Sequence, residues 1–258
     1  MTQKTALITG ASSGIGREFV YSLAEKGYNI VLVSRSQDTL EEIAEEIRTR
    51  FAVDAYVLAK DLSQELSPKE VYEEVKGQEL TINMLVNNAG FGTTGELLQS
   101  SMEKNHQQVM VNVNSVVNLT QLFLKDMVDR GEGDIINIAS MMSFLPFPYM
   151  SLYAATKAFV LSFTEGIHEE YKHKGIRVLA VCPGSTETNF FEDAPDSLKE
   201  GKMRTPKQVV ETSFKALAKN RSFIVDGTPN YTIANLPRIL PRKVITKISG
   251  SIMKKNMS

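Results

Sequence analysis

The sequence predicts a single α/β domain, a doubly wound and mostly parallel sheet of about seven strands. Short apolar runs alternate with helical patterns along nearly the whole chain, which is typical of repeated βαβ units. No Gly/Ser-rich or Pro-rich linker interrupts this alternation. The chain has 258 residues, of which 42% are hydrophobic and 23% charged, so it can bury the core of one large globular domain.

The predicted strands are short apolar runs, as expected for strands that are buried on both faces of a sheet. In chain order they span Thr5–Thr9, Asn29–Ser34, Ala55–Ala59, Met84–Asn87, Asp134–Ala139, Ile176–Cys182 and Ser222–Val225.

Segments with helical periodicity separate these strands. The first has an apolar stripe at Ile15, Phe19 and Leu23 and is expected to end at Lys26-Gly27, because glycine commonly follows the last turn of a helix. The second has its stripe at Leu40, Ile43, Ala44 and Ile47, opposite a solvated acidic face.

Three later helices are also predicted. Ser67 and Glu70 have capping-box spacing around Pro68, so Ser67 is predicted to cap the third helix. A helical pattern is predicted from Ser100 to Arg130 and a further helix from about Ser151 to Lys174, whereas residues 186–205 are interpreted as a surface segment.

Composition and charge exclude several classes of protein. The single cysteine, Cys182, cannot form an internal disulfide, so a reducing compartment is expected and the cytoplasm is predicted. The apolar run before Gly10 is too short for a signal peptide or a membrane span. With 29 basic and 30 acidic residues, the chain has no overall field for nucleic acid. No metal site is predicted, and His106, His168 and His173 are interpreted as surface or interface residues.

A glycine-rich turn joins the first strand to the first helix. Its residues are Thr9-Gly10-Ala11-Ser12-Ser13-Gly14-Ile15-Gly16. Gly10 permits a tight turn, Gly14 permits close approach of a pyrophosphate, and Gly16 permits close helix packing. The alternative is a glycine-rich turn without a ligand.

A second motif combines Tyr153, Lys157 and the earlier Ser140. Four residues on a helix bring Tyr153 and Lys157 to one face, where an ammonium group is expected to lower the phenol pKa for acid-base work. Ser140 follows the fifth strand, at the edge where open α/β sheets bind their ligands. The alternative is an amphipathic helix with an incidental Tyr and Lys.

These motifs occur at separations that together resemble the classical short-chain dehydrogenase/reductase family over about residues 5–230. The shared pieces are T-G-x-x-x-G-x-G, N-N-A-G at Asn87–Gly90, Ser140 with Y-x-x-x-K, and P-G at Pro183-Gly184. The resemblance implies a Rossmann-like catalytic domain at residues 1–230. It also implies an oxidoreductase that interconverts a carbonyl (ketone, aldehyde or 3-oxoacyl) and a secondary alcohol.

The resemblance implies a role for each matching position. Ser140, Tyr153 and Lys157 would be catalytic, with Asn112 as the proton-relay asparagine and Asn114 as its rival. The cofactor site implied by the resemblance consists of Gly10, Ser12, Ser13, Gly14, Ile15, Gly16, Asp61, Leu62, Asn88, Ala89, Gly90, Tyr153, Lys157, Pro183, Gly184, Thr186 and Thr188.

The end of the second strand indicates NADP(H) rather than NAD(H). An enzyme for NAD usually carries an acid there, which pairs with the ribose 2′-hydroxyl. Here the chain reads Val33-Ser34-Arg35-Ser36-Gln37, so Arg35 is predicted to pair with the 2′-phosphate while Ser34 and Ser36 donate hydrogen bonds to it. The alternative is that Arg35 is merely solvated.

The segment between Ser140 and Tyr153 is apolar and is predicted to form the substrate pocket for a lipophilic carbonyl compound. The predicted lining residues are Met141, Phe144, Phe147 and Phe190, with Phe191 beside the last. A homodimer or homotetramer is expected, because the helices near 100–130 and 151–174 resemble those that pair in the family. Two alternatives to a carbonyl reductase are a non-catalytic NADP(H)-sensing protein and an extended epimerase-type enzyme. Intact Ser140, Tyr153 and Lys157 argue against the first, and the glycine spacing and short C-terminal part argue against the second.

The net charge of −1 conceals two unlike parts. Residues 227–258 contain six Lys or Arg and no acid, so they carry +6 and residues 1–226 carry −7. Residues 231–258 are interpreted as a basic, amphipathic helical extension, with an apolar stripe at Val244, Ile245, Ile248 and Ile252. The favoured interpretation is a helix that covers the substrate cleft or a sister subunit, and contact with a membrane surface is the alternative.

Overall fold

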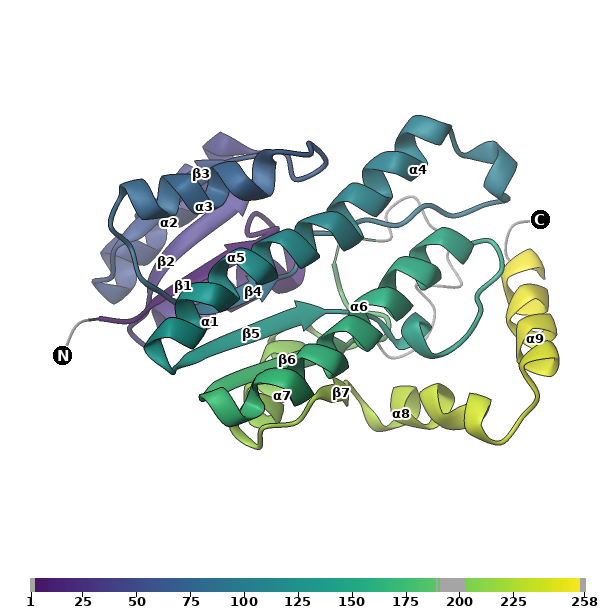
Figure 1. The fold of residues 1–258 in the computed structure, drawn as a ribbon. Coiled ribbons are helices and arrows are strands. Elements are labelled where there is room, and N and C mark those ends of the chain that lie inside the picture. Colours follow the sequence, from purple (N-terminus) through teal and green to yellow (C-terminus); the bar gives the residue numbers. More distant parts are fainter. Residues whose placement is uncertain (1–2, 189, 191–202, 256–258) are drawn as a thin grey trace.

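A parallel sheet of seven strands forms the centre of the molecule. The computed structural model describes residues 3–188, 190 and 203–255. The strand order is β3-β2-β1-β4-β5-β6-β7, and every neighbouring pair is parallel (Figure 1). The strands are β1 (Thr5–Thr9), β2 (Asn29–Ser34), β3 (Ala55–Ala59), β4 (Ile82–Asn87), β5 (Gly133–Ile138), β6 (Ile176–Cys182) and β7 (Phe223–Val225). This topology confirms the predicted fold class.

Helices cover both faces of the sheet. One face packs against α1 (Gly14–Ala24), α2 (Gln37–Phe51) and α7 (Pro206–Ala218). The other face packs against α3 (Ser67–Gly77), α5 (Ser115–Arg130) and α6 (Ser151–Tyr171). Alternate residues of β1 serve the two cores, since Ala6 and Ile8 belong to one core and Leu7 to the other.

The strand order reverses at β1, and this reversal positions the functional site. β1 pairs with β2 on one side and with β4 on the other, so the chain leaves the ends of these strands in opposite directions. Open α/β sheets bind ligands in the crevice beyond such a switch point, because the connections diverge there. The glycine turn, Ser34 and Asn88 all lie at this edge, where β1, β2 and β4 end.

Two helix predictions were wrong in detail. The helix predicted from Ser100 to Arg130 is interrupted, because a π-helical turn, Met110–Asn114, separates α4 (Met102–Val109) from α5. Ser67 does not cap α3: Leu66 occupies the N-cap position, and Ser67 is buried inside the first turn.

The C-terminal segment folds back over the end of the molecule. It contains α8 (Thr228–Asn235), a 3₁₀ turn (Leu236–Arg238) and α9 (Arg242–Lys255), and α9 stands apart from the sheet (Figure 1). The predicted apolar stripe divides into two parts, because Ile245 is buried whereas Val244, Ile248 and Ile252 are exposed. Within the described residues, no helix has both the length and the apolar character that crossing a bilayer requires.

Candidate active site

A cavity of about 900 Å³ runs along the carboxyl edge of the sheet. At one end it is lined by the glycine turn and the end of β2, and at the other by Ser140, Tyr153 and Lys157. Every predicted cofactor residue except Gly16 lines this cavity. The structure therefore brings together residues as far apart in the chain as Gly10 and Thr188.

The start of α1 suits an anionic group. Its N-cap residue, Ser13, makes no side-chain capping bond, and the first turn contains no acid. The first backbone N–H groups of a helix lack partners inside the helix and attract negative charge. Ser12, Ser13 and Gly14 line the cavity at this point, so the turn fits a pyrophosphate.

The glycines of the turn are required by close contacts. Gly10 and Gly14 have φ angles of 65° and 54°, in the left-handed region that favours glycine. A Cβ on Gly14 would lie 2.9 Å from Cγ2 of Thr188, and one on Gly16 would overlap the carbonyl oxygen of Gly10. Gly16 therefore permits tight packing of the turn and does not line the cavity, which corrects its predicted place in the cofactor site.

Asn88 fastens the glycine turn to β4. Its Nδ2 donates to the carbonyl oxygens of Thr9 at 3.0 Å and Gly10 at 3.3 Å. In return, the backbone N–H groups of Asn88 and Ala89 donate to Oγ1 of Thr9, each at 2.9 Å. The N-N-A-G motif therefore supports the turn as well as lining the cavity.

Two basic side chains, Arg35 and Lys60, line the cavity near the ends of β2 and β3. Arg35 is exposed, lines the cavity and makes no ion pair with any other residue that the structure describes. Asp61 also lines the cavity, and its Oδ1 accepts a bond from the backbone N–H of Ser63 at 3.0 Å. Lys60, which the sequence interpretation missed, lies in the same wall and pairs with Glu70 and Glu74. Its position next to Asp61 could have identified it.

Ser140, Tyr153 and Lys157 meet at the end of β5. The Ser140 side chain lies close enough to Tyr153 to lower the pKa of its phenol, and Ser140 Oγ accepts from the backbone N–H of Met142 at 3.1 Å. The Lys157 ammonium donates to the carbonyl oxygen of Ile138 at 2.7 Å and lies 5.8 Å from the centre of the Tyr153 ring. Ser143 fixes this arrangement, since its hydroxyl donates to the Lys157 carbonyl oxygen at 2.8 Å and accepts from the backbone N–H of Ser140.

Burial controls the protonation of this cluster. Burial raises the pKa of Tyr153 to about 12, although the nearby Ser140 side chain lowers that value in part. It lowers the pKa of Lys157 to about 8. The expectation of a lowered phenol pKa was therefore wrong for this structure, because loss of hydration on burial is the largest influence on the phenol. At neutral pH, Tyr153 keeps its proton and Lys157 keeps its charge.

Asn112 lies next to the cluster. Asn112 is completely buried in the π-helical turn. Its amide bonds both ways with the backbone of Phe91, at 3.1 and 2.9 Å, and donates to Oγ1 of Thr156 at 3.1 Å. A Cβ on Gly90 would meet Asn112 Oδ1 at 3.0 Å and Lys157 Nζ at 3.3 Å, so these two groups border the same small space. π-Helical turns often occur at functional sites.

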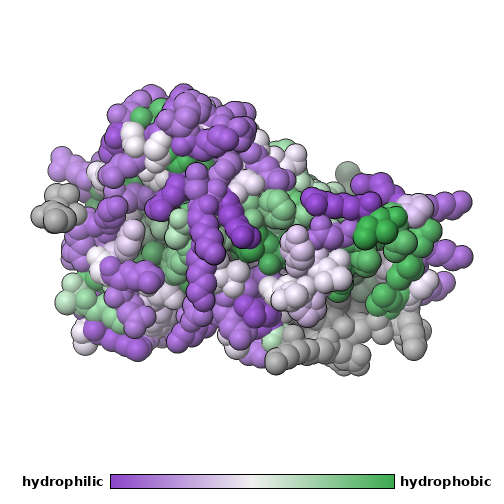
Figure 2. Space-filling view, turned by 90° about the horizontal axis from the view of Figure 1, so that it is seen from below, coloured by the Kyte–Doolittle hydropathy of each residue, from purple (hydrophilic) through white to green (hydrophobic). Residues whose placement is uncertain are grey.

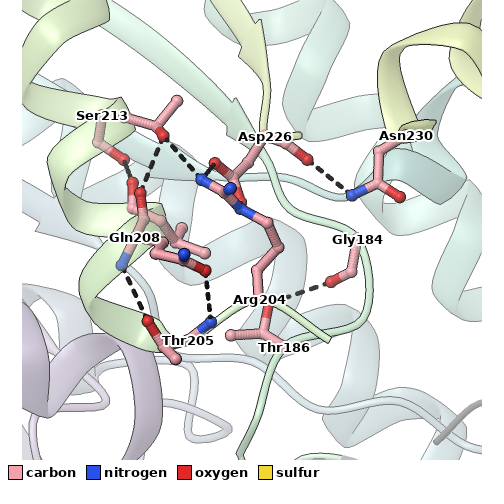
Figure 3. Close-up of polar contacts among 10 residues, drawn as sticks. Gly184, Thr186, Arg204, Thr205, Gln208, Ser213, Asp226 and Asn230 are labelled. Carbon is pink, nitrogen blue, oxygen red and sulfur yellow. Dashed lines mark hydrogen bonds and ion pairs between the residues drawn. The ribbon is translucent and has the colours of Figure 1, made fainter. Parts of the chain in front are cut away.

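An ion pair between a half-buried arginine and a buried aspartate holds the loop after β6. Arg204 makes two bonds to the fully buried Asp226, at 2.8 and 2.9 Å, from the segment before α7 to the end of β7 (Figure 3). The Arg204 backbone also pairs with Ser185 and Glu187, on either side of Thr186. The loop that bears Thr186 and Thr188 is therefore clamped to the sheet.

The substrate end of the cavity is apolar, with one correction. Met141, Phe147 and Phe190 line it, and the Phe190 ring lies 5.5 Å from that of Tyr153. Phe144 instead packs in the core against Phe223, at 5.9 Å between ring centres. Phe191 lies outside the described residues.

Met142, Gln107 and Val111 are among the further residues that line the cavity and that the sequence interpretation did not assign to the site. Gln107 and Val111 are four residues apart near the end of α4, so helical spacing could have placed them on one face.

Cys182 and His168 lie outside the proposed active-site cluster. The described residues contain no cluster of His, Cys, Asp and Glu that could hold a metal ion. Cys182 is a fully buried thiol whose pKa burial raises. His168 is buried with Nδ1 2.8 Å from the Val178 carbonyl oxygen, so its interpretation as a surface or interface residue was wrong.

The fold and cavity define a nucleotide-binding α/β protein of Rossmann-like architecture. The family model for short chain dehydrogenase matches residues 4–199, and the chain belongs to this family of oxidoreductases.

The curated relatives include reductases and a steroid dehydrogenase. The chain is 32% identical over 255 residues to a very-long-chain 3-oxoacyl-CoA reductase from Homo sapiens, which covers 95% of this chain and 80% of the relative. It is 38% identical over 185 residues to 17-beta-hydroxysteroid dehydrogenase type 3 from Rattus norvegicus, over 71% of this chain and 60% of the relative.

Solved structures share the same fold. A structure described in a study of 7beta-hydroxysteroid dehydrogenase stereoselectivity superposes with a TM-score of 0.87 at 25% identity, over 96% of both chains. A short-chain dehydrogenase from Sphingobium yanoikuyae in complex with NADPH superposes with a TM-score of 0.81 at 28% identity, over 96% of this chain and 93% of that one.

Proposed function

We propose that this oxidoreductase uses NADPH to reduce the ketone of a lipophilic 3-oxoacyl thioester to a secondary alcohol. The observation that carries the proposal is the grouping of Ser140, Tyr153 and Lys157 at the apolar end of the cavity. The names of the very-long-chain 3-oxoacyl-CoA reductases support this substrate class.

The chain's own residues supply the acid and the positioning. When bound, NADPH supplies a hydride to the carbonyl carbon. Tyr153 donates its proton to the carbonyl oxygen, and its raised pKa keeps that proton available at neutral pH. Ser140 hydrogen-bonds the same oxygen as charge develops on it. Lys157 holds the nicotinamide ribose and stabilises the phenolate that remains, and Asn112 holds a water that returns the proton.

Three features support the cofactor choice. The uncapped start of α1 suits the pyrophosphate, and Arg35 with Ser34 suits a 2′-phosphate. Solved relatives are described in complex with NADPH, among them the Sphingobium yanoikuyae enzyme and an L-sorbose reductase from Gluconobacter frateurii.

The apolar wall supports a long acyl chain. Met141, Met142, Phe147 and Phe190 offer no charged partner for a polar substrate. NADPH oxidation should be followed with 3-oxoacyl-CoA esters of increasing chain length, with a steroid ketone and a keto sugar as competitors. We expect kcat/KM to rise with acyl length and to exceed that of both competitors. A preference for the sugar would exclude the proposed substrate, and a preference for NADH would exclude the proposed cofactor.

A further inference from the structure

Helix α9 has two apolar faces, of which only one packs against the protein. Ile245, Ser249 and Met253 form the buried face. Met253 joins a cluster that includes Met142, Met150 and Tyr153, and the Ser249 hydroxyl donates to the carbonyl oxygen of Pro146 at 3.2 Å. The helix is therefore anchored on the loop that borders the substrate end of the cavity.

The second face is exposed and continues into the preceding turn. We call it the tail surface; its apolar members are Leu236, Ile239, Val244 and Ile248. Ile239 is 81% exposed and Ile248 is 50% exposed, although both are large aliphatic side chains. Figure 2 shows strongly hydrophobic residues gathered beside hydrophilic ones at the end of the molecule where α8 and α9 lie.

Basic side chains border these apolar residues. Lys243, Lys247 and Lys254 recur at helical spacing one row away from Val244 and Ile248, and Arg238 and Arg242 flank the turn before α9. None of these five makes an ion pair with another residue that the structure describes. Residues 227–258 contain no acid, so no acidic residue within this stretch of sequence compensates the positive charge.

We propose that the tail surface docks on an anionic lipid bilayer. Exposed aliphatic side chains can enter the acyl region at a bilayer surface, while the adjacent lysines contact the headgroups. The lysine stems lie along the boundary between these two regions, and the ammonium groups reach the anionic headgroups. A second copy of the chain fits less well, since a symmetric dimer through this surface would bring like charges together. The inference adds an interaction surface and does not depend on the proposed substrate.

The charge requirement is tested by vesicle sedimentation with the full-length protein. We expect binding to phosphatidylcholine vesicles that contain phosphatidylserine, weaker binding at high salt, and little binding to phosphatidylcholine alone. Each lysine contributes about fivefold to partitioning, so Lys243→Glu combined with Lys247→Glu should lower it by at least about 25-fold. The matched control is Lys215→Glu with Lys219→Glu at the end of α7, which makes the same charge change on exposed residues elsewhere.

The apolar contact is tested with a single fluorophore. The chain contains no Trp, so Ile248→Trp introduces the only indole, and Leu66→Trp places the matched control at an exposed Leu before α3. On addition of the anionic vesicles, emission from the Ile248→Trp variant should shift to shorter wavelength, whereas emission from the Leu66→Trp control should not move. Thermal melts and NADPH binding verify that all variants fold.

Two results would overturn the proposal. One is equal vesicle binding by wild type, the Lys243/Lys247 variant and the α7 control. The other is a change in sedimentation velocity between wild type and the Lys243/Lys247 variant, with no vesicle binding by either, which would assign the tail surface to contact between copies of this chain.

Discussion

The cofactor half, residues 5–90, and the C-terminal region, residues 203–255, are built in contrasting ways. In the cofactor half, backbone groups approach so closely that a single methyl group on Gly16 would overlap the Gly10 carbonyl oxygen. In the C-terminal region, α9 is fixed by one row of side chains and leaves large aliphatic residues in contact with solvent. Close backbone contacts therefore shape the glycine turn of the expected cofactor site, whereas the packing of side chains on α9 shapes the substrate end of the cavity.

The cluster of Ser140, Tyr153 and Lys157, with its proposed catalytic role, should give the largest effect. Lys157→Met keeps the length of the side chain and removes its ammonium group. We expect kcat to fall about 10³-fold, because the phenolate loses its stabilising charge. Single-turnover reduction measures the loss. Unchanged turnover in a folded variant would remove Lys157 from the mechanism.

The Arg204 clamp tests whether the C-terminal region also depends on buried polar groups. Arg204→Met leaves Asp226 buried without its partner, so the free energy of unfolding should fall by about 3 kcal/mol. The KM for NADPH should rise as well, since the loop that bears Thr186 and Thr188 is released. Urea unfolding and steady-state kinetics provide the two measurements.

A matched control exists for this variant. Arg177 also makes two bonds to an acid, Asp134, but the Arg177 side chain is 46% exposed. Arg177→Met should therefore cost about 1 kcal/mol or less and leave the KM for NADPH unchanged. Equal effects from the two variants would contradict the role of the clamp.

Substitution of Arg35 tests how the cofactor half selects its cofactor. Arg35→Ala removes the side chain expected at the 2′-phosphate, so the KM for NADPH should rise about tenfold while kinetics with NADH stay the same. The ratio of kcat/KM for the two cofactors reports the change. A preference that ignores the mutation would mean that Arg35 is merely solvated.

The smallest effect is on the pH profile. Burial lowers the pKa of Lys157 to about 8 and raises that of Tyr153 to about 12. Lys157 loses its charge as pH rises through about 8, so kcat/KM for reduction should be level below this value and fall above it. Arg35→Ala should keep this break, whereas Lys157→Met should lack it. A wild-type profile that stays level to about pH 10 would contradict the assignment.

Local patterns predicted much of the fold. The runs Thr5–Thr9, Asn29–Ser34 and Ile176–Cys182 match the strands of the structure, because continuous apolar runs between turns suit a buried parallel sheet. The cofactor edge was predictable for the same reason: its groups follow successive strand ends, and those ends lie together in any parallel sheet.

Long-range contacts were not predictable. Phe144 packs against Phe223, 79 residues away, and no local pattern distinguishes it from Phe147. The interruption of the helix at Asn112 depends on its bonds to Phe91, which belongs to another element. Likewise, helical spacing grouped Ile245 with Ile248, and only the loop beneath α9 determines which of the two is buried.

The most direct test of the central claim compares wild type with Tyr153→Phe. NADPH absorbance is followed with a long-chain 3-oxoacyl-CoA, and NADPH binding is measured separately by calorimetry. We predict that wild type oxidises NADPH with stoichiometric formation of the 3-hydroxyacyl product, and that the variant binds NADPH normally but turns over at least about 100-fold more slowly. Turnover by Tyr153→Phe at the wild-type rate would contradict the account.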